Sequence, residues 1–378
     1  MQQQTNIGVI GTGFIAKGLV RALEHHPELR TVAALTRRDV THCPDFPRQD
    51  ILTQSIDELI EKSDLVVECS GDVVYATESI NKIMQTGLPV VTMNSEFHVT
   101  TGSWFVNKGY ITEAEGDQPG STAALHKEAV SMGFRPLVYG NVKGFLNHHP
   151  TPEDMHYWAE KQGISVKQTT SFTDGTKMQI EQAFAANGLG ATIAQQGLTG
   201  PQVDSIEDAA PALIELAKKT GRPIADYVIA TGKQPAVFIF AEHDNIEQGP
   251  LQYFKLGEGP HYILPKPYHL CYFEIPRTIE RTLTKQKPLL TNSAQPEISM
   301  ASIAKRPLKK GEKLDYAIGS FDIRGEAIKV AENKGHVPIG ILENFVVREN
   351  IEPGQIITFA DVDIPDSLAL NITKELFT

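Results

Sequence analysis

Cysteine is scarce in this sequence, and its few cysteines lie far apart. The 378 residues include Cys43, Cys69 and Cys271, and they contain no CxxC pair. Such a set excludes a disulfide framework and a zinc knuckle built from cysteine pairs. Long apolar runs are also missing, and no signal peptide precedes the first predicted strand. We therefore expect a cytoplasmic protein that does not enter a membrane.

Basic residues are fewer than acidic residues in this sequence. The chain has 35 lysines and arginines against 46 acidic residues, a formal net charge of -11, and no block of basic residues. Binding to nucleic acid is not expected, because the phosphate backbone demands clustered Lys and Arg. An acidic chain also repels other anions at long range, so a phosphate-bearing ligand would need a local basic pocket.

Apolar strand-like runs alternate with amphipathic helical patterns from Asn6 to about Gly140. This alternation predicts an α/β fold that begins with a Rossmann-type, doubly wound parallel sheet. A mixture of helices and strands follows, and short strands with Lys-Gly and Pro-Gly turns complete the chain. We predict a dinucleotide-binding domain at 1–140, an α+β domain for substrate, catalysis and dimerisation at 141–295, and a small β-rich domain at 296–378.

A glycine-rich loop follows the first predicted strand and opens a helix. It contains the residues Gly11, Thr12, Gly13, Phe14 and Ile15, followed by Ala16. Glycine at the first position allows a sharp turn, glycine at the second lets a pyrophosphate approach the backbone, and a small third residue allows close packing of helix on strand. The loop is therefore predicted to bind a dinucleotide at the positive end of the helix.

Arginine stands where NAD enzymes usually carry an acidic residue. The second predicted strand ends at Leu35 and is followed by Thr36, Arg37 and Arg38, with the first carboxylate at Asp39. Because guanidinium groups bind phosphate in a fork, these arginines favour NADP over NAD. The alternative is that both are solvated loop charges.

Polar residues also follow two further predicted strands. Ser70 and Gly71 end one of them, and Asn94 and Glu96 end the next. The carboxyl ends of parallel strands face the ligand crevice, so we expect Ser70, Gly71 and Asn94 near the cofactor. Asn94 and Glu96 are candidates for substrate contact, and either is equally suited to cap the next helix.

Three carboxylates lie two residues apart in a predicted loop, at Glu113, Glu115 and Asp117. Their mutual repulsion is costly unless a cation or a shared proton relieves it. Oxygen ligands of this kind suit Mg²⁺ or Mn²⁺, so we predict a candidate metal site here. An exposed acidic turn is the alternative.

Lysines and carboxylates of the middle section are the candidate catalytic groups. Lys177 and Glu181 lie four residues apart on a predicted helix, and Asp174 precedes it. We expect Lys177 to be a proton donor with a pKa lowered by desolvation, oriented by Glu181. Lys143 is a further candidate donor to substrate, or a lysine snorkelling from a strand edge. Asp174 is an alternative helix cap, and the aromatic segment 262–273 is a candidate wall of a pocket or an oligomer contact.

The order of these motifs resembles a known group. The segments GTGFIA (11–16), TMNSEF (92–97), TEAEGDQPG (112–120), GNVKGFLN (140–147) and TSFTDGTK (170–177) are similar to homoserine-dehydrogenase-like oxidoreductases that end in an antifreeze-like (SAF) domain. The turns in KRPLKKGEKLD (305–315) and VVRENIEPGQIIT (346–358) resemble that domain. Within this group, the chain is most similar to proteins like 1-deoxy-D-xylulose 5-phosphate reductoisomerase.

That resemblance implies a homodimeric NADPH enzyme of isoprenoid precursor synthesis, acting on a sugar phosphate with a divalent metal. Homoserine dehydrogenases carry a lysine after the nicotinamide strand, where this chain has Thr92, Met93, Asn94 and Ser95. Two alternatives remain: a homoserine-dehydrogenase-like enzyme with altered specificity, and a non-catalytic sensor that keeps the dinucleotide as a ligand.

Overall fold

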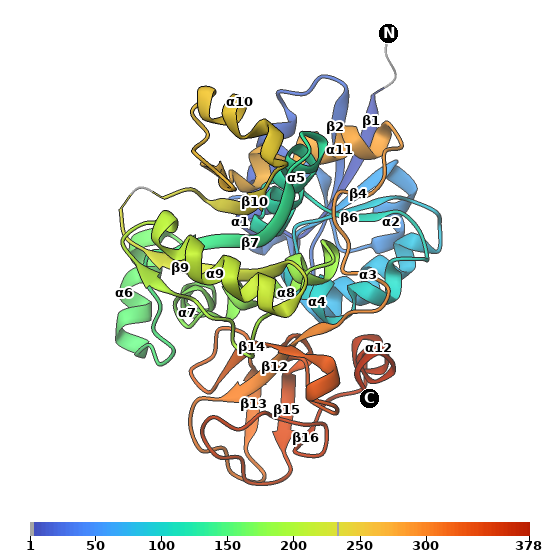
Figure 1. Cartoon of the computed structure of the whole chain (residues 1–378). Helices are drawn as coiled ribbons and strands as arrows, with labels where there is room; N and C mark the ends of the chain where they lie inside the picture. The colour runs from blue at the N-terminus through green and yellow to red at the C-terminus, as the bar shows by residue number, and fades with distance from the viewer. Residues whose placement is uncertain (1–3, 233) are drawn as a thin grey trace.

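Three structural units follow one another along the chain, as Figure 1 shows from blue through green to red. The structure is a computed structural model, and it describes residues 4–232 and 234–378. The first unit is built on a parallel sheet, the second on a mixed sheet and the third on small antiparallel sheets. This arrangement confirms the predicted α/β fold class.

The first sheet has the strand order β3-β2-β1-β4-β5-β6, and every pairing in it is parallel. Its strands are β1 (Thr5–Ile10), β2 (Leu29–Leu35), β3 (Leu52–Thr53), β4 (Leu65–Glu68), β5 (Val90–Thr92) and β6 (Ile111–Glu113). The strand order reverses between β1 and β4. A Rossmann sheet binds its ligand across the carboxyl ends of the strands at this reversal.

Helices cover both faces of the first sheet. Apolar residues of α1 (Phe14–Leu23) and α11 (Ile275–Leu283) pack on one face. Those of α2 (Ile56–Lys62), α3 (Val73–Met84) and α12 (Leu368–Phe377) pack on the other, and α4 (Ser95–Thr100) follows β5. Ser55 caps α2, since its hydroxyl accepts a hydrogen bond from Glu58 N.

The second sheet has the order β11-β10-β7-β9-β8 and mixes parallel with antiparallel pairs. Its strands are β7 (Arg135–Lys143), β8 (Gln202–Val203), β9 (Ile224–Ala230), β10 (Val237–Glu242) and β11 (His261–Lys266). Helices α5 (Gln118–Ser131) and α8 (Thr176–Gly188) pack on one face, and α9 (Ile206–Thr220) packs on the other. The remaining helices here are α6 (Pro152–Gln162), α7 (Val166–Thr173) and α10 (Gln248–Tyr253).

Near the predicted domain boundaries at residues 140 and 295, two segments belong to a different unit from the one that their position in the sequence suggests. The whole of β7 pairs within the second sheet, although it begins at Arg135. Helix α11 returns to the first sheet, where Ile275 and Ile279 are fully buried beside Ile7. These exchanges arise from tertiary pairing, which the local pattern of the sequence does not encode.

The last unit contains the antiparallel pair β12 (Ile298–Ala304) and β14 (Ile323–Lys329). A second sheet consists of β13 (Lys313–Tyr316), β15 (Glu343–Val347) and β16 (Val362–Asp363). The two segments with similar turns pair with each other, because Leu308 and Ile351 exchange backbone hydrogen bonds of 2.9 Å. Their turn glycines have nearly the same conformation, with φ 84° at Gly311 and 82° at Gly354. The predicted turns are confirmed.

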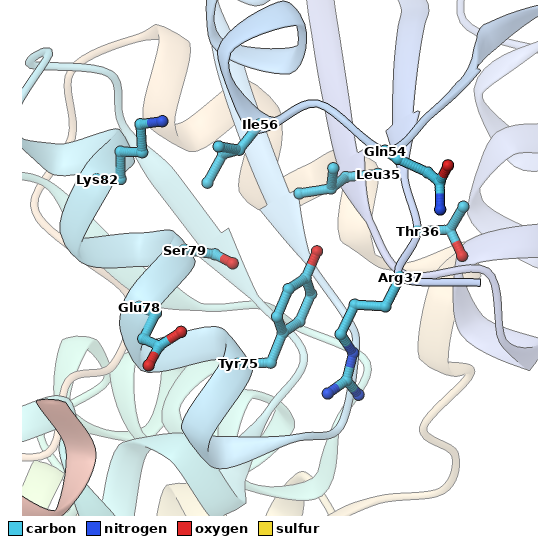
Figure 2. A pocket seen from close by; sticks show the side chains of 9 residues that line it. All are labelled: Leu35, Thr36, Arg37, Gln54, Ile56, Tyr75, Glu78, Ser79 and Lys82. Atoms are coloured by element: carbon cyan, nitrogen blue, oxygen red, sulfur yellow. The ribbon is translucent and has the colours of Figure 1, made fainter. Parts of the chain in front are cut away.

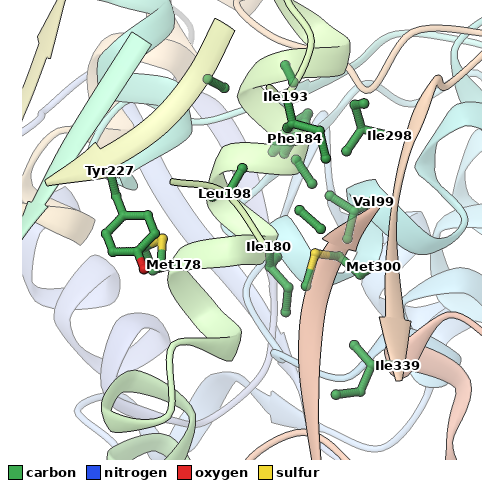
Figure 3. Packing of buried hydrophobic residues seen from close by; sticks show 14 of the residues in the cluster. Val99, Met178, Ile180, Phe184, Ile193, Leu198, Tyr227, Ile298, Met300 and Ile339 are labelled. Atoms are coloured by element: carbon green, nitrogen blue, oxygen red, sulfur yellow. The ribbon is translucent and has the colours of Figure 1, made fainter. Parts of the chain in front are cut away.

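Helix α8 lies between the second sheet and the last unit. Figure 3 shows Ile180 and Phe184 of this helix close to Ile298 and Met300 of β12. These four side chains are fully buried. Burial of this kind contributes about 1.5–3 kcal/mol for each large apolar side chain. The C-terminal unit therefore helps to hold α8 in place.

Polar bonds reinforce this contact. Gly325 N donates to Thr176 Oγ1, and Ala327 N donates to Gln179 Oε1, each at 2.9 Å. Lys305 Nζ lies 2.8 Å from Asp174 Oδ2 in an ion pair whose side chains are almost completely buried. Loss of either partner would leave a buried, uncompensated charge, which typically costs about 3–5 kcal/mol.

Candidate functional site

The glycine loop has the shape that a pyrophosphate requires. Gly11 has φ +114°, and a Cβ there would lie 2.9 Å from the carbonyl oxygen of Cys69. Gly13 is the N-cap of α1, and a Cβ there would meet no heavy atom within 4 Å. Since no side chain caps α1 and its first turn has no acidic residue, its N–H groups are available to an anion. The residues present therefore fit a dinucleotide.

A cavity of about 430 Å³ lies where β2 and β3 end, against α3 (Figure 2). It is lined by Leu35, Thr36, Arg37, Gln54, Ile56, Tyr75, Glu78, Ser79 and Lys82. The guanidinium carbon of Arg37 lies 4.5 Å from the centre of the Tyr75 ring, and Arg37 Nη2 lies 2.6 Å from Asp72 Oδ2. Arg37 therefore contacts both an aromatic face and a carboxylate.

The second arginine points toward the glycine loop. Arg38 Nη2 donates to Thr12 Oγ1 at 2.7 Å, and Thr12 Oγ1 lies 3.3 Å from Thr36 Oγ1. Arg37 and Arg38 thus lie on either side of the end of β2 with separate partners. Both arginines are exposed, so solvent also reaches them.

A buried network joins the ends of β4, β5 and β6. Glu68 accepts from Ser70 N at 2.7 Å and from Ser70 Oγ, and Asn94 Nδ2 donates to Glu68 at 3.0 Å. Asn94 N donates to Glu113 at 3.4 Å. Burial raises the pKa of Glu68 to about 7. Asn94 therefore caps α4 and fixes strand ends, as one of its two predicted alternatives proposed.

Sequence reasoning missed Glu68. Its side chain is fully buried although it is a carboxylate, and it ends the apolar run of β4. An acidic residue at the carboxyl end of a buried parallel strand is the signal that would have identified it, since that edge faces the ligand crevice.

Five charged residues form what we call the Lys177 cluster: Glu96, Asp117, Lys143, Lys177 and Glu181. Lys177 Nζ lies 3.0 Å from Glu96 Oε2 and 3.8 Å from Asp117 Oδ2. Lys143 Nζ lies 3.8 Å from Glu181 Oε2. Asn141 Nδ2 donates to Glu181 at 3.2 Å. The structure thus brings three of the predicted catalytic residues together with Glu96 and Asp117.

The charge states within the Lys177 cluster differ from expectation. Burial disfavours the charge of Lys177, but Asp117, Glu96 and Glu181 together raise the pKa of this amine above its usual range. The expected lowering of that pKa by desolvation was therefore wrong, because three carboxylates outweigh it. Burial raises the pKa of Glu181 to about 7, against the opposing effect of Lys143. Glu181, rather than Lys177, titrates near neutral pH.

The fourth predicted catalytic residue, Asp174, forms its hydrogen bonds and its ion pair with residues outside the Lys177 cluster. Its Oδ2 contacts Lys305 and its Oδ1 accepts from Thr176 N at 2.9 Å. Gly175, not Asp174, is the N-cap of α8. Asp174 therefore ties α8 to the C-terminal unit.

The three carboxylates of the predicted metal site have separate partners. Glu113 ends β6 and accepts from Thr92 Oγ1 at 2.6 Å, Glu115 lies 2.8 Å from Lys266 Nζ, and Asp117 accepts from Ser95 Oγ at 2.6 Å. Within residues 4–232 and 234–378, no group of three or more His, Cys, Asp or Glu side chains could hold a metal ion. The three carboxylates do not converge on one point, because each contacts a different protein partner, and Glu113 Oε1 is buried without a hydrogen-bond partner among the described residues.

The aromatic segment 262–273 covers the loop after β6 and the start of α1. Cys271 N donates to Gly116 O at 3.1 Å, and the rings of Phe14 and Tyr272 are 5.7 Å apart. Lys266 fixes the segment through Glu115 and through Glu274, at 2.8 and 2.9 Å. This segment therefore lies beside both the glycine loop and Asp117.

Two family models match parts of the chain. One describes the NAD-binding domain of homoserine dehydrogenase and matches residues 11–102. The other describes the catalytic domain of oxidoreductase DRL and matches residues 116–275. The matched ranges include the glycine loop in the first case and Asp117, Lys143, Lys177 and Glu181 in the second. A search of curated proteins found no match.

Solved structures of dehydrogenases resemble the chain only distantly. A homoserine dehydrogenase from a hyperthermophilic archaeon, in complex with NADPH, is 12% identical with a TM-score of 0.43, over 76% of this chain and all (100%) of that one. A myo-inositol dehydrogenase from Corynebacterium glutamicum is 11% identical with a TM-score of 0.45, over 75% of this chain and 88% of that one. An oxidoreductase from Thermotoga maritima is 14% identical with a TM-score of 0.42, over 77% and 92%.

The class of protein follows from the site and the family models together. The chain is an NAD(P)-dependent oxidoreductase. This class is defined by the Rossmann sheet, by the glycine loop whose N–H groups are available to a phosphate, and by the two matching family models. More particularly, its first domain is similar to that of homoserine dehydrogenase and its second to the DRL catalytic domain. Across residues 4–232 and 234–378, every helix is too short or too polar to span a bilayer.

Gly13→Val tests the glycine loop. Gly13 has φ -83°, which valine tolerates, and open space around its Cβ position, so the fold should be unaffected. The side chain would occupy the space through which the pyrophosphate approaches. We expect affinity for NADPH to fall by roughly tenfold or more, for a loss of about 1.4 kcal/mol or greater, with an unchanged melting temperature. Gly249→Ala, also in open space, is the control. Equal affinities of wild type and Gly13→Val for NADPH would show that the glycine loop does not bind the pyrophosphate.

Glu181→Gln tests the charge state of the Lys177 cluster without any substrate. Between pH 4.5 and about 7, folded Glu181 retains a proton that the unfolded chain releases, so stability falls as pH rises through this window. A shift of this size corresponds to about 3 kcal/mol. Urea titrations at several pH values should show a smaller decline in the free energy of unfolding for Glu181→Gln than for wild type. Glu215→Gln, which alters an exposed glutamate, is the control; parallel curves for wild type and Glu181→Gln would contradict a proton on Glu181.

Proposed function

We propose that the protein is an NADPH-dependent oxidoreductase acting on a small polar carbonyl or hydroxy compound, with the Lys177 cluster at the reacting end. One observation carries this proposal. Lys177, which is buried and charged, and Glu181, whose pKa is about 7, lie in the same cluster beyond the carboxyl ends of β5 and β6. A dinucleotide lying across the glycine loop would direct its nicotinamide toward this edge of the sheet.

In this proposal each charged residue has a separate task. The nicotinamide supplies the hydride when it is bound. Lys177, held in its charged form, stabilises negative charge on the substrate oxygen and binds that oxygen by a hydrogen bond. Glu181 exchanges the proton, because its pKa of about 7 matches the working pH. Lys143 lies beside Glu181 and favours its charged form.

The preference for NADPH is supported by the two arginines at the end of β2. Arg37 lines the cavity at the adenosine end of the predicted binding site, and Arg38 lies beside the glycine loop. A guanidinium provides the forked donors that a 2′-phosphate accepts. Arg37 Nη2 contacts Asp72, and the other N–H groups of this guanidinium would be the donors to the phosphate.

The substrate itself is better described as uncharged or cationic than as a sugar phosphate. Lys143 and Lys177 each already lie within 4 Å of a carboxylate. A phosphate in an acidic protein needs a basic pocket, and it would meet Glu96, Asp117 and Glu181 here. The comparisons do not show the metal-assisted reductoisomerase that the resemblance implied, and we prefer a homoserine-dehydrogenase-like reaction of an alcohol or aldehyde. A homodimer and a SAF-like role for the last unit stay predictions.

An assay of NADPH oxidation over a panel of carbonyl compounds tests this function. The panel should contain neutral hydroxyaldehydes, amino aldehydes and sugar phosphates, each with and without a chelator. We expect turnover of neutral or amino compounds that exceeds turnover of phosphates at least tenfold and is unaffected by the chelator. Turnover confined to sugar phosphates, or abolished by chelation, would contradict the proposal. Tight binding of NADPH without turnover of any compound would instead favour the sensor.

A further inference from the structure

Asn141 is a fully buried polar residue in the middle of the second sheet. It lies on β7, where its backbone pairs with Tyr227 of β9 and with Val237 of β10. Because side chains alternate along a strand, Asn141 and Lys143 point to the same face of the sheet. Both contact Oε2 of Glu181 there, at 3.2 Å and 3.8 Å. A central strand thus fixes Asn141 beside the carboxyl group of Glu181.

A chain of hydrogen bonds determines which way the Asn141 amide points. Gln118, the first residue of α5, donates from Nε2 to the carbonyl oxygen of Ala236 at 3.4 Å, and its Oε1 accepts from Lys143 Nζ at 3.5 Å. A carbonyl oxygen can only accept and an ammonium group can only donate, so these two neighbours fix the orientation of the Gln118 amide. Oε1 of Gln118 then accepts from Asn141 Nδ2 at 2.9 Å. The amide nitrogen of Asn141 therefore faces both Gln118 and Glu181.

This orientation leaves the other end of the amide without a partner. Asn141 Oδ1 is buried and accepts no hydrogen bond from any residue that the structure describes. A buried acceptor without a partner destabilises a fold. The opposite orientation would place Oδ1 beside Gln118 Oε1 and Glu181 Oε2, so that acceptors would face one another. The amide is therefore oriented to direct a donor at Glu181, although this orientation leaves its own oxygen unpaired.

We propose that Asn141 is a positioning residue, which keeps the exchangeable proton of Glu181 on Oε1 by donating a hydrogen bond to Oε2. An oxygen that already accepts from Nδ2 serves as the carbonyl oxygen of the neutral acid, so the proton resides on the other oxygen. In the reduction of a carbonyl compound, the Oε1–H bond breaks and its proton forms the O–H bond of the alcohol, while the carbonyl carbon receives hydride from the reduced nicotinamide. Asn141 and Lys143 then stabilise the carboxylate that remains. The inference deepens the proposed function and rests on the proton exchange assigned there to Glu181.

Other titratable groups also face Glu181. Their side chains come from β7, from α4, from the residue before α5 and from α8: Lys143, Glu96, Asp117 and Lys177. The thiol of Cys271 is also close, but burial raises its pKa to about 12, so it stays neutral near pH 7. Substitution of Asn141 removes none of these groups. A change in the titration of Glu181 in such a variant therefore reports the lost hydrogen bond.

Asn141→Leu in the full-length protein tests this role without any substrate. Leucine has nearly the same branched shape but cannot donate, so Glu181 loses a hydrogen bond that favours its charged form. The carboxylic acid band of Glu181 is followed by infrared difference spectroscopy over a pH series, and its loss in Glu181→Gln identifies it. The midpoint of this titration should rise by about one pH unit. The C=O band of the neutral acid should also move to higher frequency, because Oε2 no longer accepts from Nδ2.

A second variant and a control accompany this measurement. Gln118→Met keeps Asn141 but removes the acceptor that orients its amide, so the midpoint should rise in the same direction by a smaller amount. Asn292→Leu is the control, since Asn292 is also buried and donates to Ser103 at 3.0 Å, outside the Lys177 cluster. Its midpoint should match that of wild type. Melting temperatures establish that each variant is folded.

An unchanged midpoint or an unchanged band frequency in Asn141→Leu would overturn the proposal, as would an equal shift in Asn292→Leu. If Asn141→Leu does not fold, Gln118→Met decides, and an unshifted midpoint there has the same meaning. The test separates this inference from the proposed function. A wild type in which Glu181 does not titrate near neutral pH would contradict both, whereas unshifted variants of a titrating wild type would contradict only the role of Asn141.

Discussion

The ammonium group of Lys177 is buried among carboxylates, and the arrangement of the site depends on this one charge. Glu96 comes from α4, Asp117 precedes α5, and Glu181 lies one turn along α8 from Lys177 itself. Three carboxylates in so small a volume would repel one another strongly without a cation. Lys177 reduces that repulsion, and Glu181 reduces it further by holding a proton near neutral pH. A charged donor and a neutral acid thus lie side by side.

Helix α8 must be held rigidly for this cluster to persist. The second sheet packs on one side of it, and β12 and β14 pack on another. Hydrogen bonds fix the orientation of α8 against β14, because Thr176 and Gln179 accept hydrogen bonds from the backbone of this strand. The buried pair of Asp174 with Lys305 fixes the start of the helix. The C-terminal unit therefore supports the reacting end of the site through α8.

Local features of the site could be predicted from the sequence. The alternation of strands and helices in the first unit, the glycine loop and the turn glycines Gly311 and Gly354 follow from short patterns whose physics is local. The spacing of Lys177 and Glu181 likewise predicted that they share a helix face. Such features depend on backbone geometry within a few residues, which the sequence specifies directly.

Long-range partners could not be predicted in the same way. The sequence does not reveal that Asp174 meets Lys305, that Glu115 meets Lys266, or that three carboxylates surround Lys177. The direction of a pKa shift depends on these partners, so the expected lowering for Lys177 failed. The predicted metal site failed for the same reason, since residues two apart in sequence point to different neighbours once Glu113 ends a strand and Gln118 begins α5.

The central claim is that the charge of Lys177 stabilises the reacting oxygen, and single-turnover kinetics of Lys177→Met test it most directly. With the best substrate and bound NADPH, hydride transfer should slow roughly 100-fold or more, as for loss of one preorganised donor. Affinity for NADPH should stay within about twofold of wild type, and Lys62→Met, an exposed lysine on α2, should behave as wild type. An unchanged rate of hydride transfer in Lys177→Met would contradict the account.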